Sequence, residues 1–171
     1  RALLLVLGRA DEDAPSRAEA LLDLAEIAGK LGDALRAAEL VDSAFEAALE
    51  SPREADALEA ALKERARYDL LARAVETRLG RAETPGDAAR ALADLAFLHA
   101  EHLGGLAAAE GRLRERARTI HQSLDAGPST DDRAWAALGR VYDWLGDASA
   151  EAEVLERRLS GALASGQSSV E

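Results

Sequence analysis

The sequence predicts an all-α fold built from antiparallel helix pairs, and three observations lead to this class. The chain has 171 residues and is 48% hydrophobic but only 4% aromatic, so alanine and leucine, two strong helix formers, must provide most of the packing. Few stretches rich in Val, Ile or Thr alternate with a period of two, so no strand pattern competes with the helices. Proline and glycine punctuate the chain at regular intervals. Together these features predict a repetitive helical architecture.

The first class of break is proline. Pro15, Pro52, Pro85 and Pro128 are 37, 33 and 43 residues apart, and each lies at the start of a segment with helical apolar periodicity, where a helix accepts proline. A hydroxyl residue stands beside each proline, with an acidic residue three positions further on, which is the spacing of an N-terminal capping box. These pairs are Ser16 with Glu19, Ser51 with Glu54, Thr84 with Asp87, and Ser129 with Asp132.

The second class of break divides each interval into two helix-length halves. It consists of Gly32-Asp33, Gly104-Gly105 and Gly146-Asp147, and Ala66-Arg67 occupies the equivalent place in the second interval. These breaks are 34, 38 and 42 residues apart, and the two longer intervals contain visible insertions. A period near 34 with two helices in each repeat is typical of helical repeat arrays.

The predicted elements follow in order from these breaks. A leading half-helix at 1–9 ends a preceding repeat, and because its side chains are mostly apolar we expect the array to extend further toward the N-terminus. Four helix pairs occupy 14–50, 51–80, 84–125 and 129–163, and residues 164–171 form a flexible tail. The first helices of the pairs cover about 15–30, 52–65, 86–102 and 131–144, and the second helices cover about 34–50, 68–79, 106–125 and 148–163.

The fourth pair resembles the tetratricopeptide repeat family, whose motif places a large residue, Leu-Gly and Tyr in the first helix before a Gly-Asp turn. The matching residues are Trp135, Leu138, Gly139, Tyr142, Leu145 and Gly146-Asp147. The first three pairs fit the motif more loosely, and the resemblance spans about 14–163. It implies a right-handed α-solenoid of about four pairs, with the first helices lining a concave groove. Another α-solenoid family and an ordinary helical bundle remain as alternatives.

Small residues support stacking independently of the family. Each helix pair alone leaves part of its first helix uncovered, and stacking of pairs buries that part. Gly139, Ala25 and Ala100 are expected to permit close approach of neighbouring helices.

The charge balance argues against nucleic-acid binding. The formal net charge is −11, with a pI near 4.8, and such a surface repels phosphate backbones. Residues 1–50 contain 11 acidic and 5 basic side chains, so they form either a solvated acidic surface or the docking site of a basic partner. Residues such as Glu19 and Asp94 on the first helices also argue against reading RNA one base per repeat, because that mode needs a basic groove.

The cysteine count and the hydropathy exclude further classes of site and of protein. The chain has no cysteine, which excludes disulfides, thiol catalysis and thiolate metal sites without deciding the compartment. No segment approaches the roughly 20 apolar residues of a membrane span, so we expect no membrane insertion and a cytoplasmic location. Only Lys30 and Lys63 among 21 basic residues are lysine, and this arginine bias hints at a GC-rich bacterial genome.

The sequence offers no cluster of convergent polar groups of the kind that catalysis needs. His99 and His102 lie one turn apart, which permits a metal pair, but no third ligand has suitable spacing, so buried or surface histidines are favoured. Four arginines in "GRLRERAR" spread around their helix, so a solvated face is favoured over an anion site. We therefore expect this chain to have no enzymatic activity, no metal site and no cofactor.

The groove-facing positions of the family define the candidate binding surface, which carries mixed charge and a few apolar anchors. Its predicted members are Glu19, Leu22, Glu26, Lys30, Arg53, Asp56, Ala60, Lys63, Asp94, Leu98, Glu101, His102, Arg133, Ala136, Arg140, Asp143 and Trp144. The asparagines with which co-chaperones of the family clamp a carboxylate are missing at these positions, which argues against that activity.

Trp144 is the most informative of these residues. It follows Trp135 by nine positions, which places the two indoles about 180° apart around a helix. If Trp135 faces the core, Trp144 cannot. Exposed tryptophan beside polar neighbours is typical of a binding hot spot, and the alternative is that Trp144 packs on a following helix or on the C-terminal tail.

Two functions fit these observations. The first is a non-enzymatic scaffold that binds a peptide or helix of another protein in the concave groove. The alternative is a sensor or regulatory arm of a larger multidomain effector, such as a protease or a nucleotide-driven switch, whose partner is another part of its own full-length chain.

Overall fold

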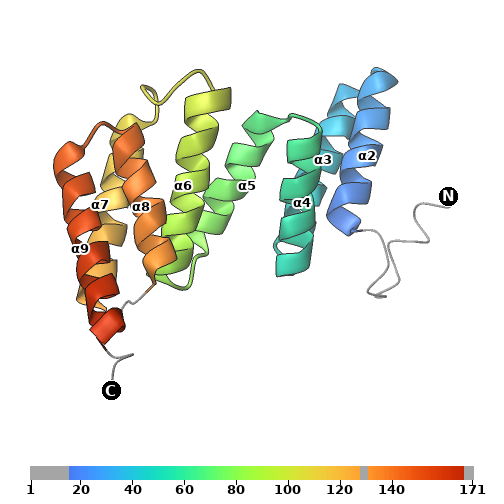
Figure 1. Ribbon diagram of the computed structural model, residues 1–171. Coiled ribbons are helices and arrows are strands. Elements are labelled where there is room, and N and C mark those ends of the chain that lie inside the picture. The colour runs from blue at the N-terminus through green and yellow to red at the C-terminus, as the bar shows by residue number, and fades with distance from the viewer. Residues whose placement is uncertain (1–15, 128–130, 168–171) are drawn as a thin grey trace. The chain divides into compact units, whose positions relative to one another are not determined.

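The computed structural model describes residues 16–127 and 131–167, and the described residues form eight α-helices and no β-strand. This confirms the all-α prediction (Figure 1). The helices are α2 (Arg17–Lys30), α3 (Ala34–Ala48), α4 (Pro52–Glu64), α5 (Tyr68–Gly80), α6 (Pro85–His102), α7 (Glu110–Ala126), α8 (Asp132–Trp144) and α9 (Ala148–Gln167).

Most helix boundaries lie within two residues of the predicted ones, and two differ more. α7 begins at Glu110 instead of 106, because Gly104 and Gly105 both adopt positive φ angles, 81° and 98°, and widen the turn. The amide of Gly105 closes this turn by donating to the carbonyl of His99 at 2.9 Å. α9 continues to Gln167, past the predicted helix end at 163. The predicted half-helix at 1–9 lies outside the described residues.

Three of the four predicted N-caps are confirmed. The hydroxyls of Ser16, Ser51 and Thr84 accept hydrogen bonds from the amides three residues further on, at 3.3, 3.3 and 3.1 Å. Ser129 lies outside the described residues, and the residue that caps α8 is Asp131, whose carboxylate accepts from the amides of Arg133 and Ala134 at 3.1 Å each. A hydroxyl or carboxylate thus satisfies amides that a helix start leaves without partners.

The turns inside the first, second and fourth pairs are built alike. In each turn an amide donates to a carbonyl five residues back: Asp33 to Ala28 at 3.0 Å, Arg67 to Leu62 at 2.9 Å and Asp147 to Tyr142 at 2.9 Å. This is the long hydrogen bond of a Schellman motif, which requires a left-handed residue just before the donor. Glycine fills that position in the first and fourth turns. In the second turn Ala66 adopts it with φ 52°, so the predicted equivalence of Ala66-Arg67 to the glycine breaks is confirmed.

The chain divides into two compact units, residues 1–74 and 75–171, and the boundary falls within α5. In the first unit, α2 and α3 form an antiparallel pair and α4 packs against both. Alanine and leucine fill the core: Ala18, Leu22, Ala44, Leu58 and Leu62 are all buried. The small side chains bring the helices close together, as the composition predicted.

In the second unit, α8 packs between α6 and α9, and α6 also contacts α7 (Figure 1). Trp135, Leu138, Val141 and Tyr142 of α8 are buried. A Cβ built on Gly139 would lie 3.4 Å from Cγ1 of Val154 on α9, so Gly139 permits the close approach that the sequence predicted. Ala25 is buried as well, whereas Ala100 is half-buried.

Glu54 connects two helices of the first unit. It lies in the first turn of α4, but its carboxylate accepts hydrogen bonds from the Ser16 hydroxyl at 2.7 Å and from the amides of Ala18 and Arg17 at 2.8 and 3.2 Å. The acid of the predicted Ser51–Glu54 box therefore caps the neighbouring helix α2. Although partial burial acts to raise it, these hydrogen bonds lower the pKa of Glu54 below its ordinary value of 4.5.

A carboxylate also joins α6 and α8 in the second unit. Asp131, the N-cap of α8, accepts a hydrogen bond from the Arg90 guanidinium of α6 at 3.0 Å. A Cβ built on Gly86 would lie 2.7 Å from Oδ2 of Asp131, so glycine at this position leaves room for the carboxylate. The two helices consequently begin side by side.

Replacing Ala66 with glycine should stabilise the protein. A non-glycine residue in the left-handed region costs about 1–2 kcal/mol, and part of this is offset by the greater chain entropy of glycine in the unfolded state. We expect Ala66→Gly to raise the free energy of unfolding by about 1 kcal/mol, measured by urea denaturation followed by far-UV circular dichroism. The matched control is Gly146→Ala, at φ 64°, which should lower stability by a similar amount; an unchanged or lower stability of Ala66→Gly would contradict this account of the turn.

Removing the Glu54 carboxylate should destabilise the start of α2. Glu54→Gln loses a charged acceptor at a helix N-terminus, and we expect a loss of about 1–2 kcal/mol at pH 7. Amide hydrogen exchange at Ala18 should accelerate. Because the pKa of Glu54 is lowered in the folded state, its contribution is present above pH 4.5 and disappears as the pH falls through the folded-state pKa.

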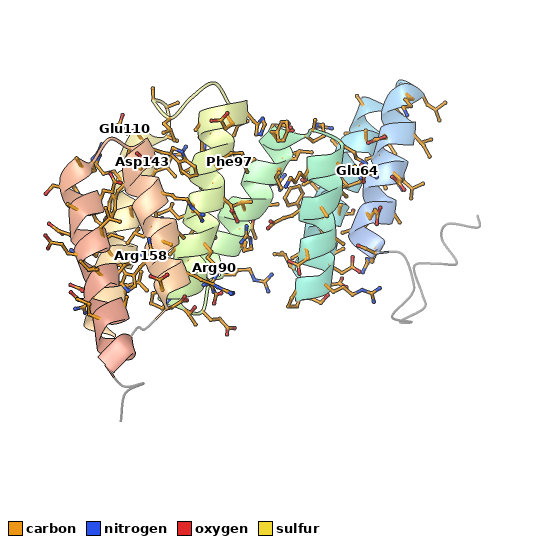
Figure 2. All side chains as sticks on the ribbon, in the orientation of Figure 1. Glu64, Arg90, Phe97, Glu110, Asp143 and Arg158 are labelled. Carbon is orange, nitrogen blue, oxygen red and sulfur yellow. The ribbon has the colours of Figure 1, made fainter. Side chains whose placement is uncertain are left out.

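The matched control for this substitution is Glu64→Gln, at the opposite end of α4 (Figure 2), where the side chain is exposed. It should retain the stability and exchange rates of the unaltered protein. Equal effects of the two substitutions at pH 7 would show that Glu54 does not cap α2.

Candidate functional site

The candidate surface in the second unit lies along the exposed faces of α6 and α8, which pack side by side. On α6, Asp94, Phe97 and Glu101 are exposed and recur at intervals of three and four, so they share one face. On α8, Arg133, Arg140 and Trp144 also recur at helical intervals along one face. Figure 2 shows that Phe97 and Asp143 lie at the same end of this helix pair.

An aromatic cluster forms at that end. The Phe97 ring centroid lies 6.1 Å from that of Trp144 and 5.7 Å from that of His102, which it meets edge to face. Phe97 is 45% exposed, and Trp144 is half-buried. Aromatic pairs at such distances attract each other, so the cluster is a pre-arranged apolar patch that connects two helices.

Trp135 lies in the core, 3% exposed, and Trp144 lies outside it, as their spacing predicted. The aromatic neighbour of Trp144 is Phe97 of α6, which precedes it in the chain, and not a residue of the following helix or tail. Trp144 is half-buried and Phe97 is 45% exposed, so part of the aromatic pair remains accessible.

Charged side chains of opposite sign flank the cluster. Asp94 and Glu101 are exposed on α6, and Arg133, Arg140 and Asp143 are exposed on α8. Asp94 accepts a hydrogen bond from Arg78 at 2.7 Å. The aromatic cluster therefore lies at one end of a surface that carries charges of both signs, which is a suitable environment for a segment with an apolar anchor and charged neighbours.

The candidate binding residues of the first unit are more polar. Glu26 forms ion pairs with Arg65 at 3.0 Å and Lys30 at 4.0 Å, and Arg65 also pairs with Asp23. The predicted residues Arg53, Asp56, Ala60 and Lys63 of α4 are exposed, and Glu19 is half-buried. Among the residues that the structure describes in the first unit, Ile27, Leu31, Leu35 and Leu49 are exposed large apolar side chains, and none of them was predicted to bind a partner.

Two predicted apolar anchors lie in the core. Leu22 is 3% exposed and Leu98 is 5% exposed, because each faces the helices packed against its own. They cannot contact a partner in this structure, and we leave them out of the proposed surface. The aromatic anchor on α6 is instead Phe97, the residue next to Leu98.

The sequence contained no signal that separates Phe97 from Leu98. Asp94 and Glu101 were both predicted to face the groove, and Phe97 and Leu98 each lie three or four residues from both of them. Both positions are therefore equally close to the direction that Asp94 and Glu101 define around the helix. The same ambiguity applies to Leu22 and Asp23 between Glu19 and Glu26, and the structure resolves it by pairing Asp23 with Arg65.

The histidines and acidic residues of the described segments do not form a metal site. No group of three or more potential ligands converges in that part of the chain. His102 contacts Phe97, whereas His99 faces a cavity beside α7, so the two side chains diverge. A metal pair on this helix would need both imidazoles on one side.

A partly buried hydrogen bond joins α7 and α8. Nδ1 of His121 and the Tyr142 hydroxyl share a hydrogen bond of 3.1 Å, and the edge of His121 meets the Trp135 ring at 5.4 Å between centroids. Burial and, secondarily, the negative charge of Asp147 raise the pKa of Tyr142 to about 12. At neutral pH the phenol is therefore protonated, and its geometry is that of a structural hydrogen bond.

No protein-family model matches this sequence, and no curated protein matches it. Among the described residues, no helix has both the length and the apolar character needed to cross a membrane.

Stability should fall steeply in alkali because of Tyr142. Since its pKa is raised from 10.0 to about 12 in the folded state, the unfolded chain releases this proton first, and stability decreases between those pH values by up to about 3 kcal/mol. Urea denaturation across pH 9–12 measures the decrease. Tyr142→Phe should remove this component of the pH dependence, whereas the control Tyr68→Phe should retain it. An identical slope in both variants would contradict the assignment to Tyr142.

Proposed function

We propose that this chain is a non-enzymatic interaction scaffold that binds a peptide or helix of a partner protein. The observation that carries the proposal is the accessible Phe97–Trp144 pair, with exposed side chains of both charges on the same two helices. Aromatic anchors surrounded by polar residues supply most of the affinity in protein interfaces. The occupant that suits this patch is an amphipathic segment with one or two apolar anchors and charges of both signs.

We further propose that the helix pairs belong to a tetratricopeptide-like, right-handed α-solenoid whose first helices line the groove. The three equivalent Schellman turns and the three equivalent hydroxyl caps support a repeated unit. The regular side-by-side packing of first helices within each unit, α2 with α4 and α6 with α8, supports stacking. These features agree with the resemblance of the fourth pair to the family motif.

One titratable contact bears on the choice between binding and chemistry. His121 and Tyr142 share a hydrogen bond, but the pKa of Tyr142, raised to about 12, keeps the phenol protonated at neutral pH, which favours a structural role for the contact. The net charge of −11 also disfavours nucleic acid as the partner. We therefore propose a protein partner and a cytoplasmic setting.

One observation favours a second candidate function, a sensor or regulatory arm of a larger chain. Leu155, Leu159 and Leu163 recur every four residues along α9 and are 52%, 63% and 63% exposed. Such a continuous stripe on one helix is suited to packing against further protein. In that case the partner of this unit is another part of the same full-length polypeptide.

Substituting the aromatic pair should weaken partner binding at least tenfold. Affinity capture with the unaltered chain identifies a partner, and titration calorimetry then measures its affinity for Phe97→Ala and Trp144→Ala. Each substitution removes a hot-spot side chain, for which a loss of about 1.4 kcal/mol or more is expected.

The matched control is Leu159→Ala, which removes an exposed apolar side chain from α9. A partner that binds Phe97→Ala and Trp144→Ala as tightly as the unaltered chain, but loses affinity for Leu159→Ala, would overturn the proposed surface. That outcome would favour the regulatory-arm function, in which α9 makes the contact.

A further inference from the structure

A second potential binding site lies on the opposite side of α6. Within the second unit, the last turns of α5, the middle of α6 and the first half of α7 enclose a cavity of about 240 Å³. Its floor is apolar, because Leu92, Leu95 and Leu113 line it and are all buried. Leu95 and Phe97 point to different sides of α6, so this cavity is separate from the aromatic cluster.

The mouth of the cavity is cationic. Arg112 and Arg116 lie one turn apart on α7, and both side chains line the opening. Arg112 is 73% exposed and makes only a loose ion pair with Glu76, at 3.9 Å. Arg116 makes no ion pair with any residue that the structure describes. The opening thus carries two guanidinium groups and one carboxylate, in a chain whose overall net charge is −11.

His99 completes the wall between floor and mouth. Burial is the main cause of its lowered pKa, with Arg112 adding to the effect and Glu76 opposing it. The imidazole is therefore neutral at pH 7 and offers a hydrogen-bond donor and an acceptor without adding charge. The wall consequently changes from apolar to polar over a short distance toward the solvent.

The volume of the cavity restricts its occupant. Sites for whole small molecules usually measure roughly 300–1,000 Å³, and this cavity of about 240 Å³ is smaller. It is suited to one large side chain inserted from outside, with the rest of the ligand on the surface. Guanidinium groups at the rim favour carboxylates as the flanking groups.

We propose that this cavity, between the end of α5, α6 and α7, binds one leucine-like side chain of an acidic peptide segment, with Arg112 and Arg116 pairing with the flanking carboxylates. The site does not depend on the proposed scaffold surface, since none of its lining residues belongs to that surface. It also gives a role to two arginines of the "GRLRERAR" stretch, for which the sequence alone favoured a solvated face over an anion site.

The test uses a defined probe, the blocked peptide acetyl-Ser-Asp-Leu-Glu-Ser-amide, titrated into isotope-labelled protein. We expect shifts in the methyl resonances of Leu92, Leu95 and Leu113 and a saturating curve. Replacing the central leucine of the peptide with alanine, or its two acids with the corresponding amides, should each weaken binding about tenfold. Binding should also weaken as salt is raised from 50 to 500 mM.

Variants on α7 distinguish binding at this cavity from a general effect of the protein's net charge. Arg116→Gln should weaken binding about threefold, and the double variant with Arg112→Gln about tenfold. The control Arg118→Gln makes the same charge change two residues away, on another face of α7, and should leave affinity within twofold. All these side chains are exposed, and the methyl spectrum of each free variant shows whether the fold is retained.

Three results would overturn the proposal. One is the absence of methyl shifts at peptide concentrations up to 10 mM, which would mean that the dissociation constant lies above the millimolar range. Another is equal affinity for the leucine and alanine peptides. The third is an equal effect of Arg116→Gln and Arg118→Gln, which would mean that only net charge attracts the peptide.

Discussion

A carboxylate that joins the starts of two neighbouring helices is the interaction on which each unit depends. Glu54 of α4 caps α2, and Asp131 caps α8 while it accepts a hydrogen bond from Arg90 of α6. Each contact satisfies backbone amides or a guanidinium and sets the two helices at the same level. Because alanine-rich faces provide little shape to define a register, these polar contacts at the helix starts supply it.

This alignment gives the second unit two different surfaces on α6. With α6 and α8 level, Phe97 meets Trp144 and forms an apolar cluster on a surface with exposed charges of both signs. On the other side, α7 starts late after the glycine turn, and Ala109 contributes only a methyl group to the cavity beside His99. One helix thus separates a broad surface suited to an amphipathic segment from a small cavity suited to a single side chain.

The helices and turns could be predicted because their signals are local. Hydroxyl caps, proline at the first helical position and left-handed turn residues act within a few residues of the chain. Even Ala66, which has no glycine signal of its own, was located by its distance from the other breaks. The late start of α7 was not predicted, because two consecutive glycines permit several turn lengths and the sequence does not select one.

The candidate site could be predicted only in part. The nine-residue spacing from Trp135 placed Trp144 outside the core, and the groove-facing positions of the resembled family placed Arg133, Arg140 and Asp143 on the surface, where all three are exposed. Leu22 and Leu98 were misplaced, because a difference of one position rotates a side chain by about 100° and a loosely matched motif does not fix that rotation. Phe97 was not predicted, because helical spacing from Asp94 and Glu101 fits Phe97 and Leu98 equally well, and its contact with Trp144 depends on the packing of two helices.

The sequence by itself determined the helical class, the positions of the caps and turns, and the acidic character that disfavours nucleic acid. The tertiary structure decided which helix each carboxylate caps, which aromatic rings meet and where a cavity remains. The physical reason is the separation along the chain of the residues that interact. Capping and turn formation need only neighbouring residues, whereas the partners of Glu54, Asp131 and Trp144 lie on other helices, 36 to 47 residues away in the chain, and packing alone brings them together.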